Sequence, residues 1–392
     1  LAQLARDMGF TQVSVSHEIS ALMKLVSRGD TTVVDAYLSP ILRRYVDGIA
    51  RELGDTRLLF MQSNGGLVDS RWFQGKDSIL SGPAGGVVGA VTTSAAEGFN
   101  KIIGFDMGGT STDVSHYDGE YERTYETLIA GVRLRVPMMH IHTVAAGGGS
   151  IVRFEGDRLR VGPASAGADP GPACYRRGGP LTVTDCNVMV GKLNAKFFPQ
   201  VFGAGGDLPL DKSATEKVFK QLVEEYHAST GKNQSPVELA HGALQIAIDN
   251  MANAIRKISV QRGYDISEYV LCCFGGAGAQ HACQVADVLG MNRIVIHRFA
   301  GVLSAYGMGL ADLRWMREQA VEQHLSAAVL GRQARLFQEI ENKGCDQLRQ
   351  QGIETDQLQV TRRVHIRYRG TDTALLVIAA DFATVVSEFE SA

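Results

Sequence analysis

The stretch at 102–115, reading IIGFDMGGTSTDVS, constrains the fold of this chain more than any other. Its first four residues form a short apolar run that predicts a buried strand, and Asp106 follows where that strand should end. The adjacent Gly108 and Gly109 permit a tight turn and let a ligand approach bare backbone. The stretch therefore predicts a strand, a turn open to a ligand, and a second strand.

Hydroxyl and carboxylate side chains complete this turn. Three hydroxyls, from Thr110, Ser111 and Thr112, are followed by Asp113 at the start of the next strand-like run. Backbone N–H groups and hydroxyls in such a turn can surround a phosphate, and Asp106 and Asp113 can hold Mg²⁺ beside it. A plain β-hairpin is the alternative, because Gly-Gly is a common turn between strands. The combination favours a phosphate loop with both aspartates as catalytic groups and metal ligands.

Further glycine clusters follow strand-like runs. Glycine accounts for 44 of the 392 residues, which is about 11% compared with about 7% in average proteins. One cluster closes the run that contains His140 and His142, and another lies between a buried strand at 269–274 and a helix. Both are predicted to cradle a nucleotide, since such turns present backbone N–H groups. The predicted cofactor-binding residues in them are Gly147, Gly148, Gly149, Gly275, Gly276, Ala277 and Gly278.

Two further segments each permit two interpretations. The cluster at 81–86 precedes a helical run of small residues, so it indicates either an anion site or a close contact between helices. His140 and His142 share one face of a strand, but a third metal ligand at a recognisable spacing is missing nearby. We interpret these histidines as core or hydrogen-bonding residues.

A proline-stiffened loop at 161–180 carries charged side chains. Arg176 and Arg177 are candidates for holding a carboxylate or phosphate of the substrate, and a solvated charge pair is the alternative. Beyond the loop, Leu181–Val183 predicts a short strand ending near Asp185. Asp185 is a candidate catalytic carboxylate, and its alternative role is to cap the helical run that follows.

Composition excludes some classes of function. The net charge of −3 offers no basic surplus for a nucleic-acid partner, and no run of 18 apolar residues predicts a membrane span. The six cysteines lack a C-x-x-C pair, which favours reduced thiols in a cytoplasmic protein.

The helical pattern outlines the organisation of the chain. Ser235-Pro236-Val237-Glu238 predicts a helix start with a capping box, and a long amphipathic helix is expected over 327–351. The helical pattern at 31–53 is expected to be interrupted at Pro40. The chain begins at Leu1 within a helical pattern and ends after another, so we expect an internal fragment of a longer protein.

Several motifs together resemble the hydantoinase A/5-oxoprolinase family of the actin-like ATPase superfamily. They are SGPAGGVVGA (81–90), GFDMGGTSTDVS (104–115), TVAAGGGS (143–150), VGPASAGADPGPACYRRGGPLTVTD (161–185), FGGAGAQHAC (274–283) and GVLSAYGMGLAD (301–312). The motifs QHAC at 280–283 and RYRGTD at 367–372 most resemble those of the 5-oxoprolinase branch of this family. The resemblance covers nearly the whole chain.

The resemblance implies an α/β fold with actin-like, ribonuclease H-like lobes and an α+β C-terminal extension. Residues 1–100 would complete a first lobe whose N-terminal part is missing, residues 101–315 would form the second lobe, and residues 316–392 would start the extension. The turn at 106–113 would be the second phosphate loop and that at 275–278 the adenosine-side turn. ATP and Mg²⁺ are the implied cofactors, and a monovalent cation is a further candidate.

The implied activity is ATP-dependent opening of 5-oxo-L-proline to L-glutamate through phosphorylation of the lactam oxygen, a step of glutathione metabolism. A hydantoinase B-type subunit or fused domain is the expected partner, homo-oligomers are expected, and the isolated chain is expected to be inactive. One alternative is the ATPase subunit of a hydantoinase or ketone carboxylase. Another is a non-catalytic nucleotide-dependent switch.

Overall fold

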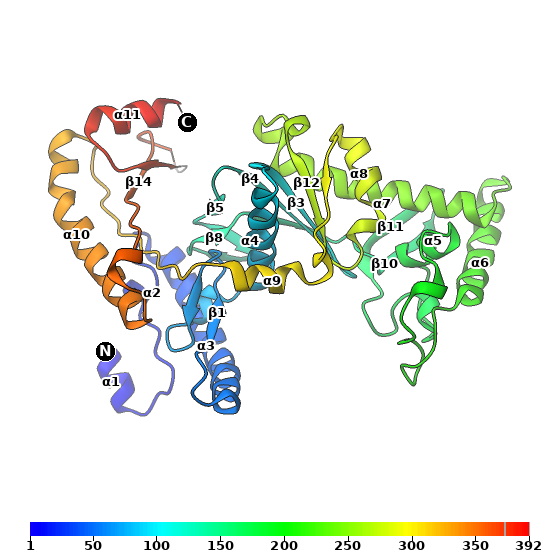
Figure 1. Ribbon diagram of the computed structural model, residues 1–392, viewed down its shortest axis with the longest axis horizontal. Coiled ribbons are helices and arrows are strands. Elements are labelled where there is room, and N and C mark those ends of the chain that lie inside the picture. Colours follow the sequence, from blue (N-terminus) through cyan, green and yellow to red (C-terminus); the bar gives the residue numbers. More distant parts are fainter. Residues whose placement is uncertain (372–373, 392) are drawn as a thin grey trace.

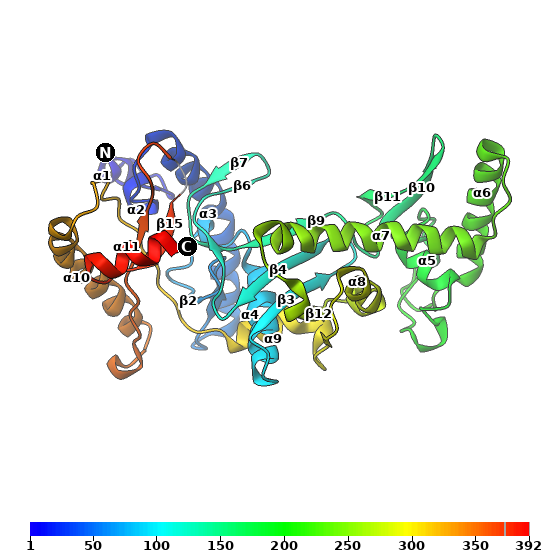
Figure 2. The ribbon, with the colours of Figure 1, turned by 90° about the horizontal axis from the view of Figure 1, so that it is seen from above.

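A computed structural model of the protein describes residues 1–371 and 374–391, so position 372 of the RYRGTD motif lies outside the described residues. The molecule is elongated, with a central sheet flanked by two end regions (Figures 1 and 2). Both chain termini lie in one end region, together with helices α1, α10 and α11 (Figure 1). The other end carries α5, α6 and the hairpin β10–β11 (Figure 2).

The central sheet has five strands in the order β13-β12-β3-β4-β9. Strands β3, β4 and β9 are antiparallel neighbours, whereas β12 runs parallel to both β3 and β13. Counted along the chain from β9, the order is third, second, first, fourth, fifth, which is the topology expected of a ribonuclease H-like lobe. The strands are β3 (Lys101–Met107), β4 (Thr112–Asp118), β9 (Ile141–Val144), β12 (Val270–Phe274) and β13 (Ile294–Val295).

Helices cover both faces of this sheet. On one face lies α7 (Pro236–Ile258), which begins at the predicted capping box of Ser235 and Glu238. Its apolar stripe is buried against β3, β4 and β12, with Leu244, Met251 and Ile258 all at most 2% exposed. The helix that the sequence predicts is therefore confirmed, and it forms the main core of the molecule.

Two small-residue helices cross on the other face: α4 (Ser81–Ala96) and α9 (Leu303–Leu310). A Cβ atom added at Gly307 would lie 2.0 Å from the carbonyl oxygen of Gly85, and one at Gly89 would lie 2.6 Å from that of Leu303. Such spacing leaves no room for side chains between the helices. Of the two interpretations of the 81–86 cluster, the close contact between helices is the one that the structure supports.

The remaining elements form the two ends of the molecule and the two-stranded sheets between them. At the end with the termini are α1 (Ala2–Asp7), α2 (Ser16–Ile19), α3 (Leu25–Leu53), β1 (Leu59–Met61), β2 (Leu67–Asp69), α10 (Ala327–Gln350), β14 (Arg363–Ile366), β15 (Leu375–Ile378) and α11 (Phe382–Ser391). Between the ends and at the far end are β5 (Arg123–Thr124), β6 (Thr127–Ile129), β7 (Val132–Leu134), β8 (Met138–Met139), β10 (Ser150–Glu155), β11 (Arg158–Ser165), α5 (Val183–Met189), α6 (Lys212–Thr230) and α8 (Ala282–Leu289).

Helix α3 corrects one prediction, because it continues through Pro40 without interruption. Tertiary contacts hold the helix on both sides of the proline. Ser39 accepts a hydrogen bond from the N–H of Gly75 at 3.1 Å, and Arg43 donates to the carbonyl oxygen of Ser70 at 2.9 Å. These contacts offset the cost of the proline ring inside the helix, which local sequence reasoning does not count.

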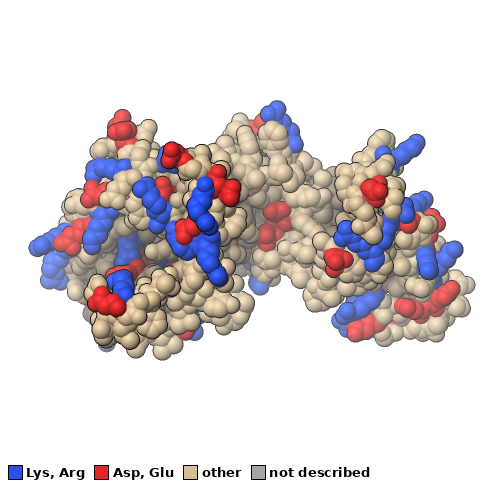
Figure 3. Space-filling model, turned by 90° about the horizontal axis from the view of Figure 1, so that it is seen from below, with Lys and Arg blue, Asp and Glu red and all other residues tan. Residues whose placement is uncertain are grey.

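Charged side chains are distributed over the surface without separation by sign. In Figure 3, basic and acidic groups are intermixed at both ends, and the waist between them carries few charges on this face. No helix in the described part of the chain is long and apolar enough to cross a membrane. Four of the six cysteines are buried, and all six are free thiols.

Candidate active site

The two predicted carboxylates lie opposite each other where β3 and β4 join. Asp106 pairs in register with Asp113 across the antiparallel hairpin. The turn between them is closed by a 3.0 Å hydrogen bond from the N–H of Gly108 to the carbonyl oxygen of Ser111. The structure thus brings together the aspartates that the sequence separates by six residues. Neither forms an ion pair with a lysine or arginine of residues 1–371 or 374–391.

The surroundings of the pair favour the uncharged form of each carboxyl group. Burial raises the pKa of Asp106 to about 6, with a further contribution from the nearby charge of Asp113, while the Ser304 hydroxyl at 3.5 Å opposes the shift. Burial also raises the pKa of Asp113, and a 2.6 Å hydrogen bond from Thr143 opposes it. Two half-buried carboxylates without a cation are the surroundings in which a divalent ion is favoured.

The predicted turn at 147–149 packs directly on the turn at 108–109. Gly148 donates to the carbonyl oxygen of Gly108 at 3.1 Å, and Gly149 donates to that of Gly109 at 2.6 Å. A Cβ atom at Gly147 would lie 2.7 Å from the backbone of Gly109. Glycine is therefore required here because two backbones touch, and two turns predicted independently form one surface.

The third predicted turn, at 275–278, contacts the carboxylate of Asp106. Gly275 has a φ of +83°, and a Cβ atom there would lie 2.3 Å from Asp106 Oδ1. The N–H of Ala277 donates to the carbonyl oxygen of Met107 at 2.9 Å. Gly109 and Gly276, by contrast, have no atom within 4 Å of an added Cβ. We call residues 108–112, 147–149 and 275–278 the glycine cradle: bare backbone around two carboxylates, with an open side.

The three predicted hydroxyls differ in their availability. Thr112 is buried, and its hydroxyl donates to the carbonyl oxygen of Ala146 at 2.6 Å. Thr110 is exposed and Ser111 is half-buried. Thr112 therefore anchors the loop from within, whereas the other two can reach a ligand, and the cofactor-binding role of all three stays a prediction.

Asp185 lies apart from the carboxylate pair. It is fully buried in the first turn of α5, where Thr182 is the N-cap, so the predicted strand at Leu181–Val183 is absent from the described structure. Its carboxylate accepts hydrogen bonds from the N–H groups of Ala173 at 3.1 Å, Cys174 at 2.8 Å and Thr182 at 2.9 Å, and from the hydroxyls of Thr182 at 2.8 Å and Thr215 at 3.1 Å. We therefore assign no chemical step to Asp185.

Replacing Asp185 with asparagine is expected to lower the free energy of unfolding by about 3 kcal/mol, since an amide leaves buried N–H donors without an acceptor. Turnover per folded molecule should be unchanged. Chemical denaturation of the variant and of a control, Asp207→Asn at an exposed position, measures the first effect. A variant of normal stability but lost turnover would return Asp185 to the catalytic residues.

The two predicted substrate arginines bind the segment before α6. Arg176 forms an ion pair with Asp211 at 2.9 Å and donates to the carbonyl oxygen of Pro209 at 2.7 Å. Arg177 lies within 3.4 Å of the carbonyl oxygen of Gly203. Both arginines thereby tie the 161–180 loop to the segment before α6, and the structure does not bring them into contact with the carboxylate pair. Their role toward substrate stays a prediction.

Two site residues were missed by sequence reasoning. Thr143 on β9 pairs in register with Asp113 on β4. Ser304 on α9 contacts Asp106, which lies 198 positions earlier in the sequence. The position of Thr143 at the end of a strand before three glycines was a usable signal. No local pattern identifies Ser304, because its contact with Asp106 depends on how α4 and α9 cross.

The histidine interpretation is supported for His140, whose Nδ1 lies 3.2 Å from Glu122. The same carboxylate accepts from His116 at 2.7 Å and from Arg262. In the described part of the chain, no group of three or more histidine, cysteine, aspartate or glutamate side chains is arranged to hold a metal ion. A divalent ion at Asp106 and Asp113 would therefore need ligands from a bound phosphate or water, as is usual for Mg²⁺.

The sheet topology and the glycine cradle define an α/β fold of the actin-like ATPase type. The chain belongs to the hydantoinase/oxoprolinase family, whose sequence model matches residues 28–317. The resemblance deduced from the motifs is thus confirmed.

Relatives and solved structures agree with this assignment. The chain is 43% identical to "5-oxoprolinase 1" of Arabidopsis thaliana and 42% identical to "5-oxoprolinase" of Saccharomyces cerevisiae. In both cases 96% of this chain aligns with 30% of the relative, so the chain spans less than a third of their length. The crystal structure of an ATP-dependent caprolactamase from Pseudomonas jessenii matches with a TM-score of 0.84 at 29% identity, covering 100% of this chain and 58% of that one.

Proposed function

We propose that this chain is the ATP-binding part of an enzyme that couples ATP hydrolysis to the opening of a cyclic amide, with 5-oxo-L-proline as substrate and L-glutamate as product. The observation that carries the proposal is the pair Asp106 and Asp113, held without a cation inside bare glycine backbone. The similarity to 5-oxoprolinases supports the choice of 5-oxo-L-proline as the proposed substrate.

The chemistry needs ATP because a lactam is resonance-stabilised and reacts slowly with water. Transfer of the γ-phosphoryl group to the lactam oxygen releases ADP and leaves an activated ring carbon. Water then adds to this carbon, and the C–N bond breaks as the ring nitrogen takes a proton, which leaves an acyl phosphate. A second water hydrolyses this acyl phosphate to the carboxylate and inorganic phosphate. Phosphoryl transfer depends mainly on positioning and on neutralising charge, which are the tasks that a rigid cradle can perform.

The residues of the cradle divide these tasks. The N–H groups of Gly109 and Thr110 would hold phosphate oxygens, and the turn at 147–149, whose own N–H groups are bonded within the protein, would support that loop. The turn at 275–278 would hold the adenosine side. Asp106 and Asp113 would hold Mg²⁺, which supplies positive charge for the phosphates. Thr143 and Ser304 orient the two carboxylates through their hydroxyls.

The experiment that tests the proposal is an assay of the full-length polypeptide with Mg-ATP and one candidate substrate at a time. Candidates are 5-oxo-L-proline, a hydantoin, ε-caprolactam and acetone, and the readouts are phosphate release and ring-opened or carboxylated product. We expect coupled turnover with 5-oxo-L-proline. Coupling to another compound alone would move the protein to a different branch, and ATP binding without any coupled turnover would favour a nucleotide-dependent switch.

A partner is also part of the proposal. The chain is 32% identical over 91% of its length to the "Caprolactamase subunit alpha" of Pseudomonas jessenii, whose name implies a further subunit. We infer that hydrolysis of the activated intermediate takes place in a hydantoinase B-type subunit or fused domain.

The raised pKa of Asp106 predicts a pH dependence of stability. Between its ordinary value of 3.8 and about 6, the folded state binds this proton more tightly than the unfolded state does. The stabilisation from protonated Asp106 is thus present at low pH and is lost as the pH rises through about 6. Without nucleotide, the melting temperature of the Asp106→Asn variant minus that of the wild type should increase as the pH rises from 4 to 7. A difference independent of pH would contradict the raised pKa.

A further inference from the structure

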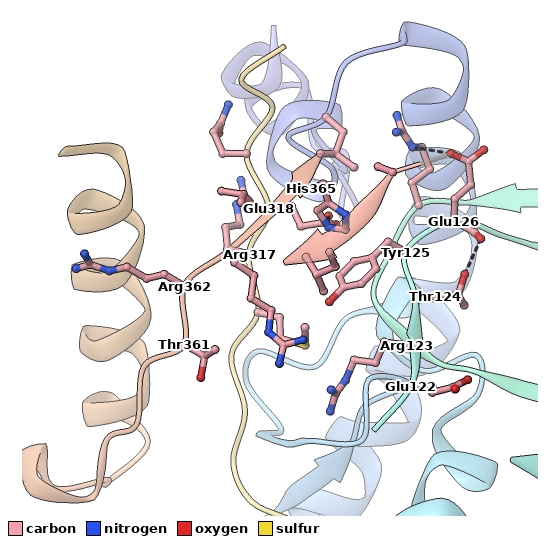
Figure 4. A pocket seen from close by; sticks show the side chains of 18 of the residues that line it. Glu122, Arg123, Thr124, Tyr125, Glu126, Arg317, Glu318, Thr361, Arg362 and His365 are labelled. Atoms are coloured by element: carbon pink, nitrogen blue, oxygen red, sulfur yellow. Dashed lines mark hydrogen bonds and ion pairs between the residues drawn. The ribbon is translucent and has the colours of Figure 1, made fainter. Parts of the chain in front are cut away.

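A large cavity lies between the strands β5–β8 and the C-terminal region, and Thr143 at the edge of the active site is one of its lining residues. Its volume is about 3080 Å³, and its walls come from strand β5, the segment after α9, and strand β14. Figure 4 shows Arg123 and Tyr125 on one wall of the cavity, at β5, with Glu318 and His365 across from them. The rings of Tyr125 and His365 meet edge-on at 4.7 Å.

Two arginines of this cavity lack a carboxylate partner. Arg123 donates from Nε to the carbonyl oxygen of Asn64 at 3.0 Å, but its buried Nη2 has no hydrogen-bond partner in the described part of the chain. Arg314 also lines the cavity, and its guanidinium forms no ion pair with any described residue. Both arginines are half-buried. Cationic groups that are partly removed from water are normally paired, so the absence of a carboxylate partner for both calls for an explanation.

The turn after β1 positions both arginines. The backbone of Asn64 binds Arg123, and a Cβ atom at Gly66 would lie 2.2 Å from the Cβ atom of Arg314. The N–H of Arg314 donates to the carbonyl oxygen of Leu67 at 3.1 Å. The segment at 64–67, which contains the Asn-Gly-Gly turn, thus contacts both arginines, although they lie far apart in the sequence.

The electrostatics of the cavity wall favour a negative ligand. Burial, together with the neighbouring charge of Arg314, lowers the pKa of Arg123 to about 10. Burial also raises the pKa of Tyr121 and Tyr125, which keeps their phenol groups neutral and able to donate. Two acidic groups of this wall are already engaged, because Glu120 pairs with Arg363 and Glu318 pairs with His365 at 3.0 Å.

We propose that Arg123 and Arg314 form a binding site for an oxyanion, the carboxylate or phosphate group of a small molecule, with tyrosine hydroxyls as further donors. Guanidinium groups bind both kinds of anion through paired hydrogen bonds. The site does not depend on the proposed ATP-coupled function, since no residue is shared with the glycine cradle.

The test uses the full-length polypeptide, with the nucleotide site saturated by a non-hydrolysable ATP analogue so that phosphate cannot report on the cradle. Calorimetric titrations with inorganic phosphate and with L-glutamate, at constant ionic strength, distinguish the two sources of the anion. We expect saturable binding of at least one of them. Arg123→Gln and Arg314→Gln should each weaken it by about tenfold or more, since each removes a charged hydrogen bond.

The matched control is Arg335→Gln, which makes the same change at a side chain that is 90% exposed on α10 and lies outside the cavity. It should bind like the wild type. A second readout guards against misfolding: without added anion, Arg123→Gln should melt no lower than the wild type, since it removes an unneutralised buried charge. Absence of binding to the wild type, or equal binding by wild type and both cavity variants, would overturn the proposal.

Discussion

Replacing Asp106 with asparagine in the full-length polypeptide is expected to reduce ATP-dependent turnover by about a hundred- to a thousand-fold, the usual cost of losing one electrostatic element of an active site. The side chain lies where β3 ends, 2.3 Å from the position of a Cβ atom at Gly275 and in register with Asp113. Asparagine keeps the size and polarity of this group. It removes the charge that would hold Mg²⁺, so the effect should fall on turnover and not on folding.

Steady-state phosphate release and thermal unfolding, each with and without Mg-ATP, separate the two effects. The control is Asp157→Asn, which changes the same charge at the exposed turn between β10 and β11, where the side chain is 85% exposed. At neutral pH the Asp106 variant should be at least as stable as the wild type, because it removes a charge that burial and the neighbouring Asp113 disfavour. Near-normal turnover would remove Asp106 from the mechanism and would weaken the phosphate-loop interpretation of 106–113.

The second large effect is expected from a single methyl group at the crossing of α4 and α9. A Cβ atom at Gly307 would lie 2.0 Å from the carbonyl oxygen of Gly85 and 2.5 Å from the backbone nitrogen of Gly89. Because these are backbone atoms of a packed helix, no change of rotamer can relieve the overlap. We expect Gly307→Ala to lower the free energy of unfolding by about 3 kcal/mol, the upper part of the range for overpacked cores.

Gly309→Ala on the same helix is the matched control, since no atom lies within 4 Å of a Cβ atom added there. This variant should be neutral or gain up to about 1 kcal/mol from helix propensity. Urea denaturation of both variants gives the comparison. The Gly307 variant should also lose turnover, because the displaced α9 carries Ser304 away from Asp106. Equal stability of the two alanine variants would contradict the close crossing of the helices.

Local sequence patterns were sufficient for the parts of the site that lie within one hairpin or one helix start. The strand before Asp106, the turn at Gly108 and Gly109, and the capping box of α7 were all predicted where the structure has them. Each rests on interactions between residues that are neighbours along the chain. Residue type and spacing therefore contain the necessary information.

Contacts between distant segments could not be obtained in this way. Asp185 resembled a catalytic carboxylate because its surroundings were unknown. Thr182 of its own capping box supplies two of its five hydrogen bonds, and folding brings the other three from Ala173, Cys174 and Thr215. Pro40 is accepted in α3 because tertiary contacts hold the helix on both sides. In both cases the free energy of long-range contacts outweighs a local preference, and no window of sequence includes it.

The same reason explains how the active site and the cavity are assembled. The motifs predicted all three turns of the glycine cradle, but the stacking of these turns follows from the order of strands in the sheet. The contact between Ser304 and Asp106 follows from the crossing of α4 and α9. Arg123 and Arg314 are unremarkable in sequence and acquire a shared, unneutralised environment only through the turn at 64–66. Chemical groups are encoded residue by residue, whereas their distances depend on which surfaces the whole chain buries together.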